Sequence, residues 1–202
     1  MTSRLPGDDA AGATPLTDED IDGLIPTFVA TRADLNLAEQ ANIEASTLWS
    51  FGRRRVANTE RLLTIDFADR LHRRMFANVW RWAGQHRTRM TNIGVDPHQI
   101  TPQMKLLFDD AIYWHAHAIL QPAECSVRLH HRLVSVHPYR NGNGRQARFM
   151  ADLYLRVNGE PRLTWGTAAS LEVDSATRYD YITALQAADR NDIEPLLEFA
   201  QG

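Results

Sequence analysis

The stretch HPYRNGNGRQAR, which begins at His137, gathers residue types that suit phosphate chemistry. Gly142 and Gly144 can adopt backbone angles closed to other residues, so successive N–H groups can turn to one side and form a nest for an anion. Arg145 and Arg148 are three residues apart, which puts them on one helix face, where both can donate to phosphate oxygens. His137 is the side chain type that acts most readily as a general base near pH 7. The spacing therefore predicts an anion cradle with a base beside it.

A helix that begins near Gly144 would strengthen this cradle. Its first N–H groups have no partner within the helix, and its dipole places partial positive charge at the same spot. Asn143 could donate its side-chain amide into the same cavity. The alternative is structural: a glycine turn between two helices, flanked by solvated arginines, with a histidine packed in the core. Since all these features fall within twelve residues, we favour the phosphate site.

The elements that must position this site are mainly helical. Apolar residues recur at helical spacing over most of the chain after Thr31, and Pro102 and Pro122 suit the first turn of a helix. Gly94 and Pro97 interrupt this pattern, so residues 86–100 are expected to form an extended hairpin or flap. The helices are expected over residues 31–55, 64–84, 102–119, 122–136, 145–158, 169–190 and 193–201.

Composition narrows the class of protein. The 202 residues are 44% hydrophobic and 23% charged, which is ordinary for a globular domain, and the net charge of −3 argues against a protein that coats nucleic acid. Cys125 is the one cysteine, so an intramolecular disulfide and a cysteine metal cage are excluded, and a reducing cytoplasm is favoured. The sequence pattern leads us to expect neither a secretory signal nor a membrane-spanning helix. Residues 1–30 are expected to form a mobile N-terminal tail.

The stretch HPYRNGNGRQAR resembles the signature of the Fic (Fido) family, His-x-Phe-x-(Asp/Glu)-Gly-Asn-Gly-Arg-x-x-Arg. WRWAGQHR followed by NIGVDPHQI is similar to the family's substrate-clamping flap, and RYDYITALQAADRNDIEPLLEF is similar to its closing helices. More narrowly, the chain resembles the group called mobile mystery protein B, found on mobile elements beside a helix-turn-helix protein. The resemblance implies a Fic domain over residues 59–201, which is a helical bundle with a small β-hairpin flap. An N-terminal helix over residues 31–58 is expected to precede this domain.

The resemblance also implies an activity, the transfer of AMP from ATP to a Ser, Thr or Tyr hydroxyl of a target protein. It implies that His137 deprotonates the target, and that Asn143 and Arg145 complete the catalytic set. The implied nucleotide-binding residues are Gly142, Asn143, Gly144, Arg145 and Arg148. The implied target-binding flap consists of Asn92, Ile93, Gly94 and Val95. No membrane and no direct nucleic acid contact is expected, while a neighbouring helix-turn-helix protein is an expected partner.

The sequence departs from the family signature at two positions. Tyr139 replaces phenylalanine, which keeps an apolar ring and adds a hydroxyl that needs a partner. Asn141 replaces the acidic residue that holds Mg²⁺, and an uncharged amide oxygen is a weaker ligand for a hard cation. We therefore expect Mg²⁺ to be held mainly through the nucleotide phosphates. This substitution keeps a second reading open, a weakly active or inactive nucleotide-binding regulatory module, toxin-like, that acts with a partner protein.

Two further features concern specificity and restraint. Relatives that transfer phosphate carry a lysine where Gly144 stands, so its absence here favours AMP transfer. Many relatives also carry a helix with the motif Ser/Thr-x-x-x-Glu-Gly/Asn, whose glutamate pairs with the second signature arginine. Here LNLAEQAN places Glu39 in the equivalent part of the chain, with Leu35 and Gln40 at the flanking positions. Glu39 is thus either an inhibitory partner of Arg148 or an exposed helical glutamate.

Overall fold

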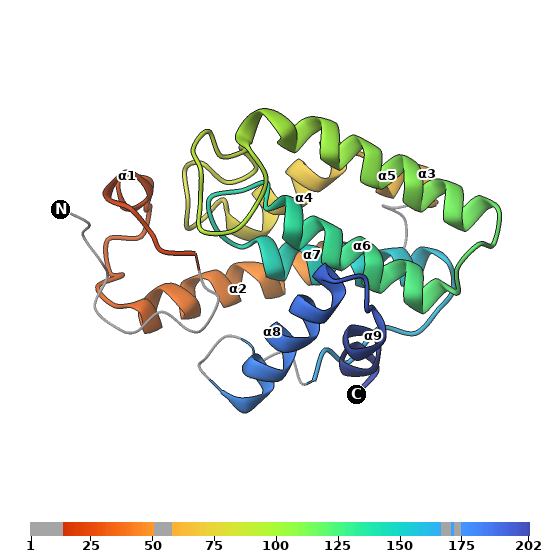
Figure 1. The fold of residues 1–202 in the computed structure, drawn as a ribbon. Coiled ribbons are helices and arrows are strands. Elements are labelled where there is room, and N and C mark those ends of the chain that lie inside the picture. The colour runs from red at the N-terminus through yellow and green to blue at the C-terminus, as the bar shows by residue number, and fades with distance from the viewer. Residues whose placement is uncertain (1–13, 51–57, 167–170, 172–174) are drawn as a thin grey trace.

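Helices make up nearly all the regular structure in the part of the chain that the computed structural model describes, which is residues 14–50, 58–166, 171 and 175–202 (Figure 1). The mainly helical fold predicted from the sequence is confirmed. In chain order the elements are α1 (Asp18–Ile21), α2 (Arg32–Ser50), α3 (Thr59–Leu62), α4 (Ile65–Phe76), the 3₁₀ turn η1 (Pro97–Gln99), α5 (Ile100–Ala116), α6 (Pro122–Val136), α7 (Asn143–Val157), α8 (Ala176–Asp189) and α9 (Glu194–Gln201).

The helices α6 and α7 form the centre of the fold (Figure 1). Every residue of α7 from Gln146 to Leu155 is buried, as is typical of a helix covered on all sides. The helix α5 packs against α6, while α3 and α4 contact α7. A second apolar cluster, which includes Trp165, Tyr181 and Leu196, joins α8 and α9 to this centre. The HPYRNGNGRQAR stretch runs from the end of α6 into α7, so the two central helices fix both ends of the loop.

Local capping explains where several helices begin. The Thr64 hydroxyl accepts a hydrogen bond from the Phe67 N–H at 3.1 Å and starts α4, and Pro122 occupies the first turn of α6 as predicted. The helix α5 begins at Ile100, two residues before the predicted Pro102, because η1 leads directly into it. The predicted helix 31–55 is confirmed as far as Ser50, and residues 51–57 lie outside the described part of the chain.

The predicted helix over residues 64–84 is wrong in its second half, because α4 ends at Phe76. The residues that follow form turns, which place Trp80 and Trp82 in the core with their rings stacked at 4.7 Å. The turns end at Gly84, whose φ of +77° favours glycine. The interpretation of both tryptophans as core residues is therefore confirmed.

The β-hairpin expected over residues 86–100 is not confirmed. This part of the chain contains no strand, and its one β-bridge is an isolated pair between His86 and Tyr139. The Arg87 side chain bonds the carbonyl oxygens of Arg89 and Val95 across the loop. A charged side chain thus takes the carbonyl groups that a hairpin would pair with another strand. We call residues 86–96 the flap loop below.

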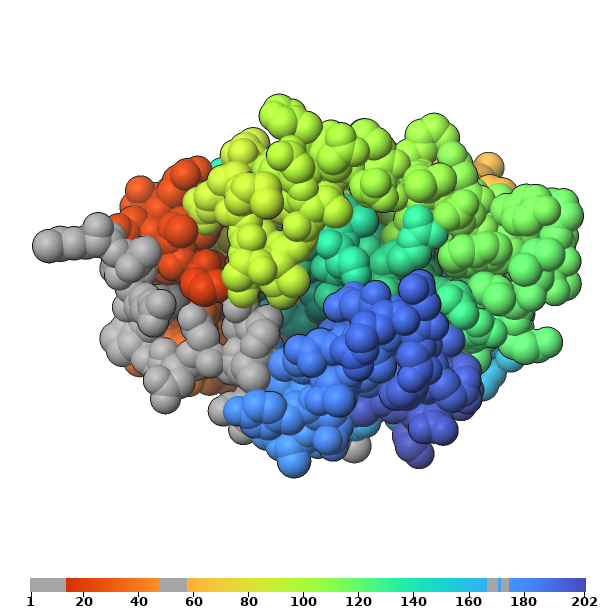
Figure 2. All heavy atoms as spheres, in the orientation of Figure 1, coloured from red at the N-terminus to blue at the C-terminus, as the bar shows by residue number. Residues whose placement is uncertain are grey.

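The described part of the expected N-terminal tail is ordered against the rest of the molecule. Residues 14–30 include the helical turn α1, with Leu16 and Asp20 buried. Figure 2 shows these residues, in red and orange, against the yellow-green atoms of the flap loop region. Residues 14–30 thus pack against the fold in the stretch where a mobile tail is expected from the sequence, and residues 1–13 lie outside the described part. Charge pairs hold this segment, and composition alone did not reveal them.

None of the described helices is long and apolar enough to cross a membrane.

Candidate active site

His137 sits at the C-terminal end of α6, in a left-handed backbone conformation with φ 53° and ψ 60°. Its N–H donates to the Leu133 carbonyl at 3.0 Å, and its own carbonyl accepts the Arg87 Nε–H at 2.7 Å. These bonds stabilise a conformation that is uncommon for a residue with a side chain. Burial, with the charge of Arg87 adding to it, lowers the pKa of His137 to about 4. The ring is therefore neutral at pH 7 and able to accept a proton.

The two ring nitrogens of His137 have different surroundings. Nε2 lies 2.9 Å from the Thr14 hydroxyl oxygen, whereas Nδ1 is buried. In the tautomer that carries its proton on Nδ1, Nε2 accepts a hydrogen bond from the hydroxyl. The ring nitrogen that would act as a base, Nε2, is thus the nitrogen that already contacts an alcohol oxygen.

Gly142 and Gly144 are both constrained, but in different ways. Gly142 has φ +79°, and a Cβ there would lie 2.5 Å from the Phe76 ring, so any side chain would be both strained and obstructed. Gly144 has no such conflict, since a Cβ there would lie 3.7 Å from the nearest atom, Nη1 of Arg148. There is open space above the Gly144 Cα, at the start of α7 and beside Arg148. That space suits a bound anion.

The Asn143 amide does not donate into the cavity as expected. Its Oδ1 accepts the Tyr139 N–H at 2.9 Å, and its Nδ2 donates to the Tyr139 carbonyl at 2.8 Å. The side chain therefore holds the loop closed, as a backbone pair would. Asn141 behaves similarly, because its Oδ1 accepts the Gly142 N–H at 2.5 Å. Both amides shape the loop rather than line its open face.

Glu39 is 1% exposed and meets two partners across the fold. Its Oε2 lies 2.6 Å from Nη2 of Arg145, and its Oε1 accepts the Trp80 indole N–H at 2.6 Å. The sequence pointed to the second signature arginine, Arg148, but the ion pair that the structure shows is with the first, Arg145. The reading of Glu39 as an exposed helical glutamate is wrong. The helix α2 packs against α4 and thereby carries its carboxylate into the site.

Arg148 is 9% exposed and lies on the same side of α7 as Gly144. Its guanidinium is 5.8 Å from the centre of the Tyr181 ring, a cation–π arrangement. The Tyr181 hydroxyl lies 3.0 Å from His130 Nε2. Burial, together with the charge of Arg148, holds the pKa of His130 well below its usual value. Arg145 and Arg148 thus bring two positive charges to the first turns of α7, next to the glycine loop.

Three residues that position the loop were missed by the sequence interpretation. Arg87 bonds the backbone of His137 and of the flap loop, as described above. His72 stacks on the Tyr139 ring at 3.8 Å, accepts the Gly84 N–H at Nδ1 and donates from Nε2 to the Asn141 carbonyl. Asp69 accepts the Tyr139 hydroxyl at 2.9 Å. Arg87 lies within WRWAGQHR, the stretch that resembles the family's flap, and this was the signal in the sequence that could have found it.

The four predicted flap residues differ in exposure. Asn92 and Ile93 are exposed, as a target-binding segment requires. Gly94 and Val95 face inward: a Cβ on Gly94 would lie 2.7 Å from that of His137, and the Val95 N–H bonds the Val136 carbonyl at 3.4 Å. The flap loop therefore lies directly against the catalytic candidate.

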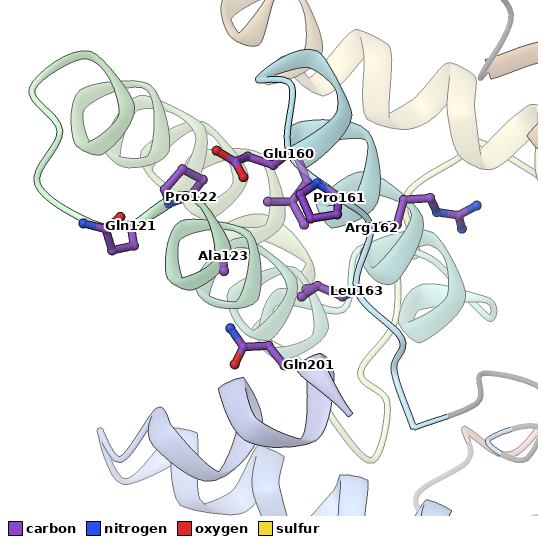
Figure 3. A pocket seen from close by; sticks show the side chains of 9 residues that line it. Gln121, Pro122, Ala123, Glu160, Pro161, Arg162, Leu163 and Gln201 are labelled. Carbon is purple, nitrogen blue, oxygen red and sulfur yellow. The ribbon is translucent and has the colours of Figure 1, made fainter.

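A separate surface pocket lies at the opposite end of α6 and α7 (Figure 3). Its lining includes Pro122 at the start of α6, Leu155 near the end of α7, and Gln201 of α9. A helix of this length spans about 20 Å, so the pocket is remote from the glycine loop. Among the described residues, no cluster of three or more His, Cys, Asp or Glu side chains could hold a metal ion.

The sequence is similar to a known protein family and to several of its named members. Residues 62–155 match the model of the Fic/DOC family. Protein adenylyltransferase fic-1 of Caenorhabditis elegans is 30% identical over 145 residues, covering 68% of this chain and 26% of that protein. Protein adenylyltransferase Fic of Nematostella vectensis is 29% identical over 142 residues, 68% of this chain and 31% of that protein. The chain thus spans under a third of these relatives' length.

Solved structures show the same fold. Fic-1 (residues 134–508) of C. elegans superposes with a TM-score of 0.64 at 23% identity, covering 88% of this chain and 50% of that one. The BepC protein of Bartonella tribocorum, solved with bound AMPPNP, has a TM-score of 0.64 at 17% identity, covering 84% of this chain and 85% of that one. The overall helical fold is therefore shared with these proteins.

Proposed function

We propose, on the premise that residues 62–155 belong to the Fic/DOC family, that this chain transfers AMP from ATP to a hydroxyl group of a protein. The observation that carries the proposal is the meeting of His137 Nε2 with an alcohol oxygen at 2.9 Å, beside a glycine loop flanked by two arginines. The names of the relatives, protein adenylyltransferases, support the same reaction.

In the proposed reaction, the acceptor hydroxyl oxygen forms a bond to the α-phosphorus of ATP, and the bond from that phosphorus to the pyrophosphate oxygen breaks. The hydroxyl proton passes to Nε2 of His137, which burial keeps neutral and ready to accept it. The other residues contribute mainly position and charge. Pyrophosphate leaves with its negative charge compensated by the arginines.

Two sets of groups are proposed to hold the nucleotide. The backbone N–H groups of Gly142, Asn143 and Gly144, at the start of α7, are proposed to hold the α- and β-phosphates, which requires the Gly142 N–H to exchange its bond with Asn141 for one with ATP. Arg145 and Arg148 hold the β- and γ-phosphates, which requires Arg145 to exchange its bond with Glu39 for one with ATP. We therefore propose that Glu39 restrains the site. Asn143 acts through the loop that its amide holds closed.

Mg²⁺ is proposed to bind mainly through the phosphates. Asn141 offers one neutral oxygen, and that oxygen already accepts the Gly142 N–H. A hard cation prefers charged oxygen ligands, so Asn141 alone does not make a metal site. When bound with the nucleotide, the metal would offset negative charge on the phosphates during transfer.

Three further proposals concern the setting of the reaction. The acceptor is a Ser, Thr or Tyr hydroxyl of a target protein, and a helix-turn-helix protein is the proposed regulatory partner, as in the mobile mystery protein B group. A cytoplasmic location is proposed, because Cys125 is the chain's one cysteine and is a buried free thiol.

The test is incubation of the purified chain with cell lysate and ATP labelled on either the α- or the γ-phosphate. We expect label on protein from α-labelled ATP only, and loss of about 10²–10⁴-fold in rate for His137→Ala. An exposed histidine changed in the same way, His98→Ala, is the control. Label from the γ-position alone would indicate phosphate transfer. Nucleotide binding without any label would support the regulatory module.

A further inference from the structure

The hydroxyl that meets His137 belongs to the chain itself. Thr14 lies 123 residues before His137 in sequence, yet its Oγ1 is 2.9 Å from Nε2 of that ring. Other hydroxyls near the site have partners of their own: Thr17 donates to Asp20, and Tyr139 donates to Asp69. Thr14 therefore occupies, with its alcohol, the position that a substrate hydroxyl needs to give its proton to the base.

A buried ion cluster holds the segment that carries Thr14. Asp20 is fully buried, and its Oδ2 binds Arg89 of the flap loop, while Arg140 of the glycine loop lies 3.6 Å from its Oδ1. Glu19 also pairs with Arg140, at 2.9 Å. These bonds tie the segment to both sides of the site. Since a buried carboxylate is stable only when it is paired, the cluster fixes the segment in one place.

Local structure then sets the direction of the chain toward His137. Thr17 and Asp20 form a capping box, in which each side chain bonds the other's backbone N–H. Leu16, 4% exposed, packs into the main core. The segment is thus anchored at Leu16 and at α1, and Thr14 lies two residues before the first anchor. An anchored acceptor reacts as part of the same molecule, which removes the entropic cost of bringing two partners together.

We propose that Thr14 is a site of self-modification, which accepts AMP from ATP bound in the same chain. The proposal rests on the AMP-transferring function proposed above. The Thr14 Oγ1 forms a bond to the α-phosphorus of ATP, the bond to the leaving pyrophosphate breaks, and the hydroxyl proton passes to His137 Nε2. The products are an AMP ester of Thr14 and pyrophosphate. The ester can no longer donate a hydrogen bond to His137, so the modification also frees the base.

The experiment follows the purified full chain with ATP and Mg²⁺, by intact mass and by peptide mapping. We expect one AMP group per chain, located at Thr14, with a first-order rate that stays the same when the protein is diluted tenfold. The Glu39→Gln variant is run in parallel, because it removes the carboxylate charge that pairs with Arg145. Both proteins are also given lysate with α-labelled ATP, which reports transfer to other proteins.

Matched variants distinguish the effect of losing the Thr14 hydroxyl from the effect of disturbing the fold. Thr14→Val keeps the shape and removes the hydroxyl, so self-labelling should fall to background while labelling of lysate proteins persists. Thr14→Ser should retain self-labelling. Thr101→Val, an exposed threonine at the start of α5, should label as the wild type does. Asp20→Asn weakens the ion cluster and should slow self-labelling several-fold without abolishing transfer to lysate proteins.

Each outcome decides a separate point. Label on lysate proteins but none on Thr14 would overturn this inference and leave the proposed function intact. Self-labelling at another residue, or at a rate proportional to protein concentration, would also overturn it. No label on any protein, in the wild type and in Glu39→Gln, would overturn both proposals together.

Discussion

Tyr139 stands where the family signature has phenylalanine, and its environment accommodates the extra oxygen. The ring is fully buried and stacks on His72, while the hydroxyl donates to Asp69 Oδ1 at 2.9 Å. The same oxygen of Asp69 lies 3.0 Å from His86 Nε2. A buried hydroxyl without a partner would be costly, so Asp69 is the residue that makes tyrosine acceptable here. The sequence-based expectation of a hydroxyl partner is confirmed.

Tyr139→Phe should lower the free energy of unfolding by about 1 kcal/mol, the typical net value of one hydrogen bond. The loss is limited because His86 remains beside Asp69 and the stacked ring is kept. Urea unfolding measures the change, with Tyr113→Phe as the control, since the Tyr113 side chain is exposed. Equal stability of Tyr139→Phe and the wild type would show that the Asp69 bond contributes nothing.

At the scale of elements, α2 acts on the site through one residue. The Glu39 carboxylate is held by Trp80 on one oxygen and by Arg145 on the other. The indole bond fixes the carboxylate in place, where it would compete with phosphate for Arg145 if that guanidinium binds the nucleotide as proposed. Keeping 99 molecules in 100 in the state with Glu39 paired to Arg145 takes only ~2.7 kcal/mol, since each tenfold change in the equilibrium constant corresponds to about 1.36 kcal/mol. One charge-assisted pair in a buried setting can supply this.

Glu39→Gln should therefore raise the rate of AMP transfer at least several-fold and tighten ATP binding. The amide keeps the shape and can still accept from Trp80, but it loses the charge that attracts Arg145. Transfer rates and ATP titrations measure both effects. Glu44→Gln, an exposed glutamate on the same helix, should change neither. If Glu39→Gln matches Glu44→Gln in both measurements, α2 does not restrain the site.

The flap loop contributes a second effect at this scale. Ile93 is 37% exposed at its tip, whereas Gly94 packs against His137 and Arg87. Extended loops of this kind can bind a target segment through exposed side chains and backbone groups. The two neighbouring positions should therefore respond differently to substitution.

Ile93→Ala should weaken labelling of target proteins several-fold while ATP affinity stays unchanged and stability stays within about 0.5 kcal/mol. Gly94→Ala should instead reduce all transfer, including self-labelling, because its Cβ would press on His137. Labelling assays with α-labelled ATP, combined with ATP titration, distinguish the two variants. A parallel loss of ATP binding in Ile93→Ala would place Ile93 in the fold rather than at the target.

For the whole molecule, buried histidines link stability to pH. Burial lowers the pKa of His72 to about 3 and that of His137 to about 4, and it holds the pKa of His130 well below its usual value. All three rings are neutral in the folded protein. In the unfolded chain they would take up protons near pH 6.5. The unfolded state therefore binds more protons below that pH, and stability rises with pH through this range.

The free energy of unfolding should be independent of these histidines above pH 7 and should fall as the pH drops from 6.5 toward 4. Each histidine adds a slope of up to about 1.4 kcal/mol per pH unit. Urea unfolding at pH 7, 6 and 5 measures the slope, and His72→Gln should reduce it by the share of one histidine. A slope that is the same in His72→Gln and in the wild type would show that His72 titrates alike in both states.

Features that depend on neighbouring residues could be predicted from the sequence alone. Pro122 and the apolar spacing after it predicted α6, because proline suits a first helical turn and the buried stripe repeats with the helix period. The glycine loop was visible in the same way, since Gly142 at φ +79° meets a local backbone demand. The candidate base and both arginines lie within the same twelve residues, so the core of the site was predictable.

Only the tertiary structure decided which distant side chains meet. Glu39 and Arg145 are 106 residues apart, and Thr14 and His137 are 123 apart. Such pairs depend on how α2 and the N-terminal segment pack against α4, α7 and the flap loop, and a shift of one helical turn would change the partner. For the same reason the sequence pointed to Arg148 instead of Arg145, and to a mobile tail where a buried Asp20 anchors the chain. Charge pairing across the fold is set by three-dimensional distance, which no local pattern records.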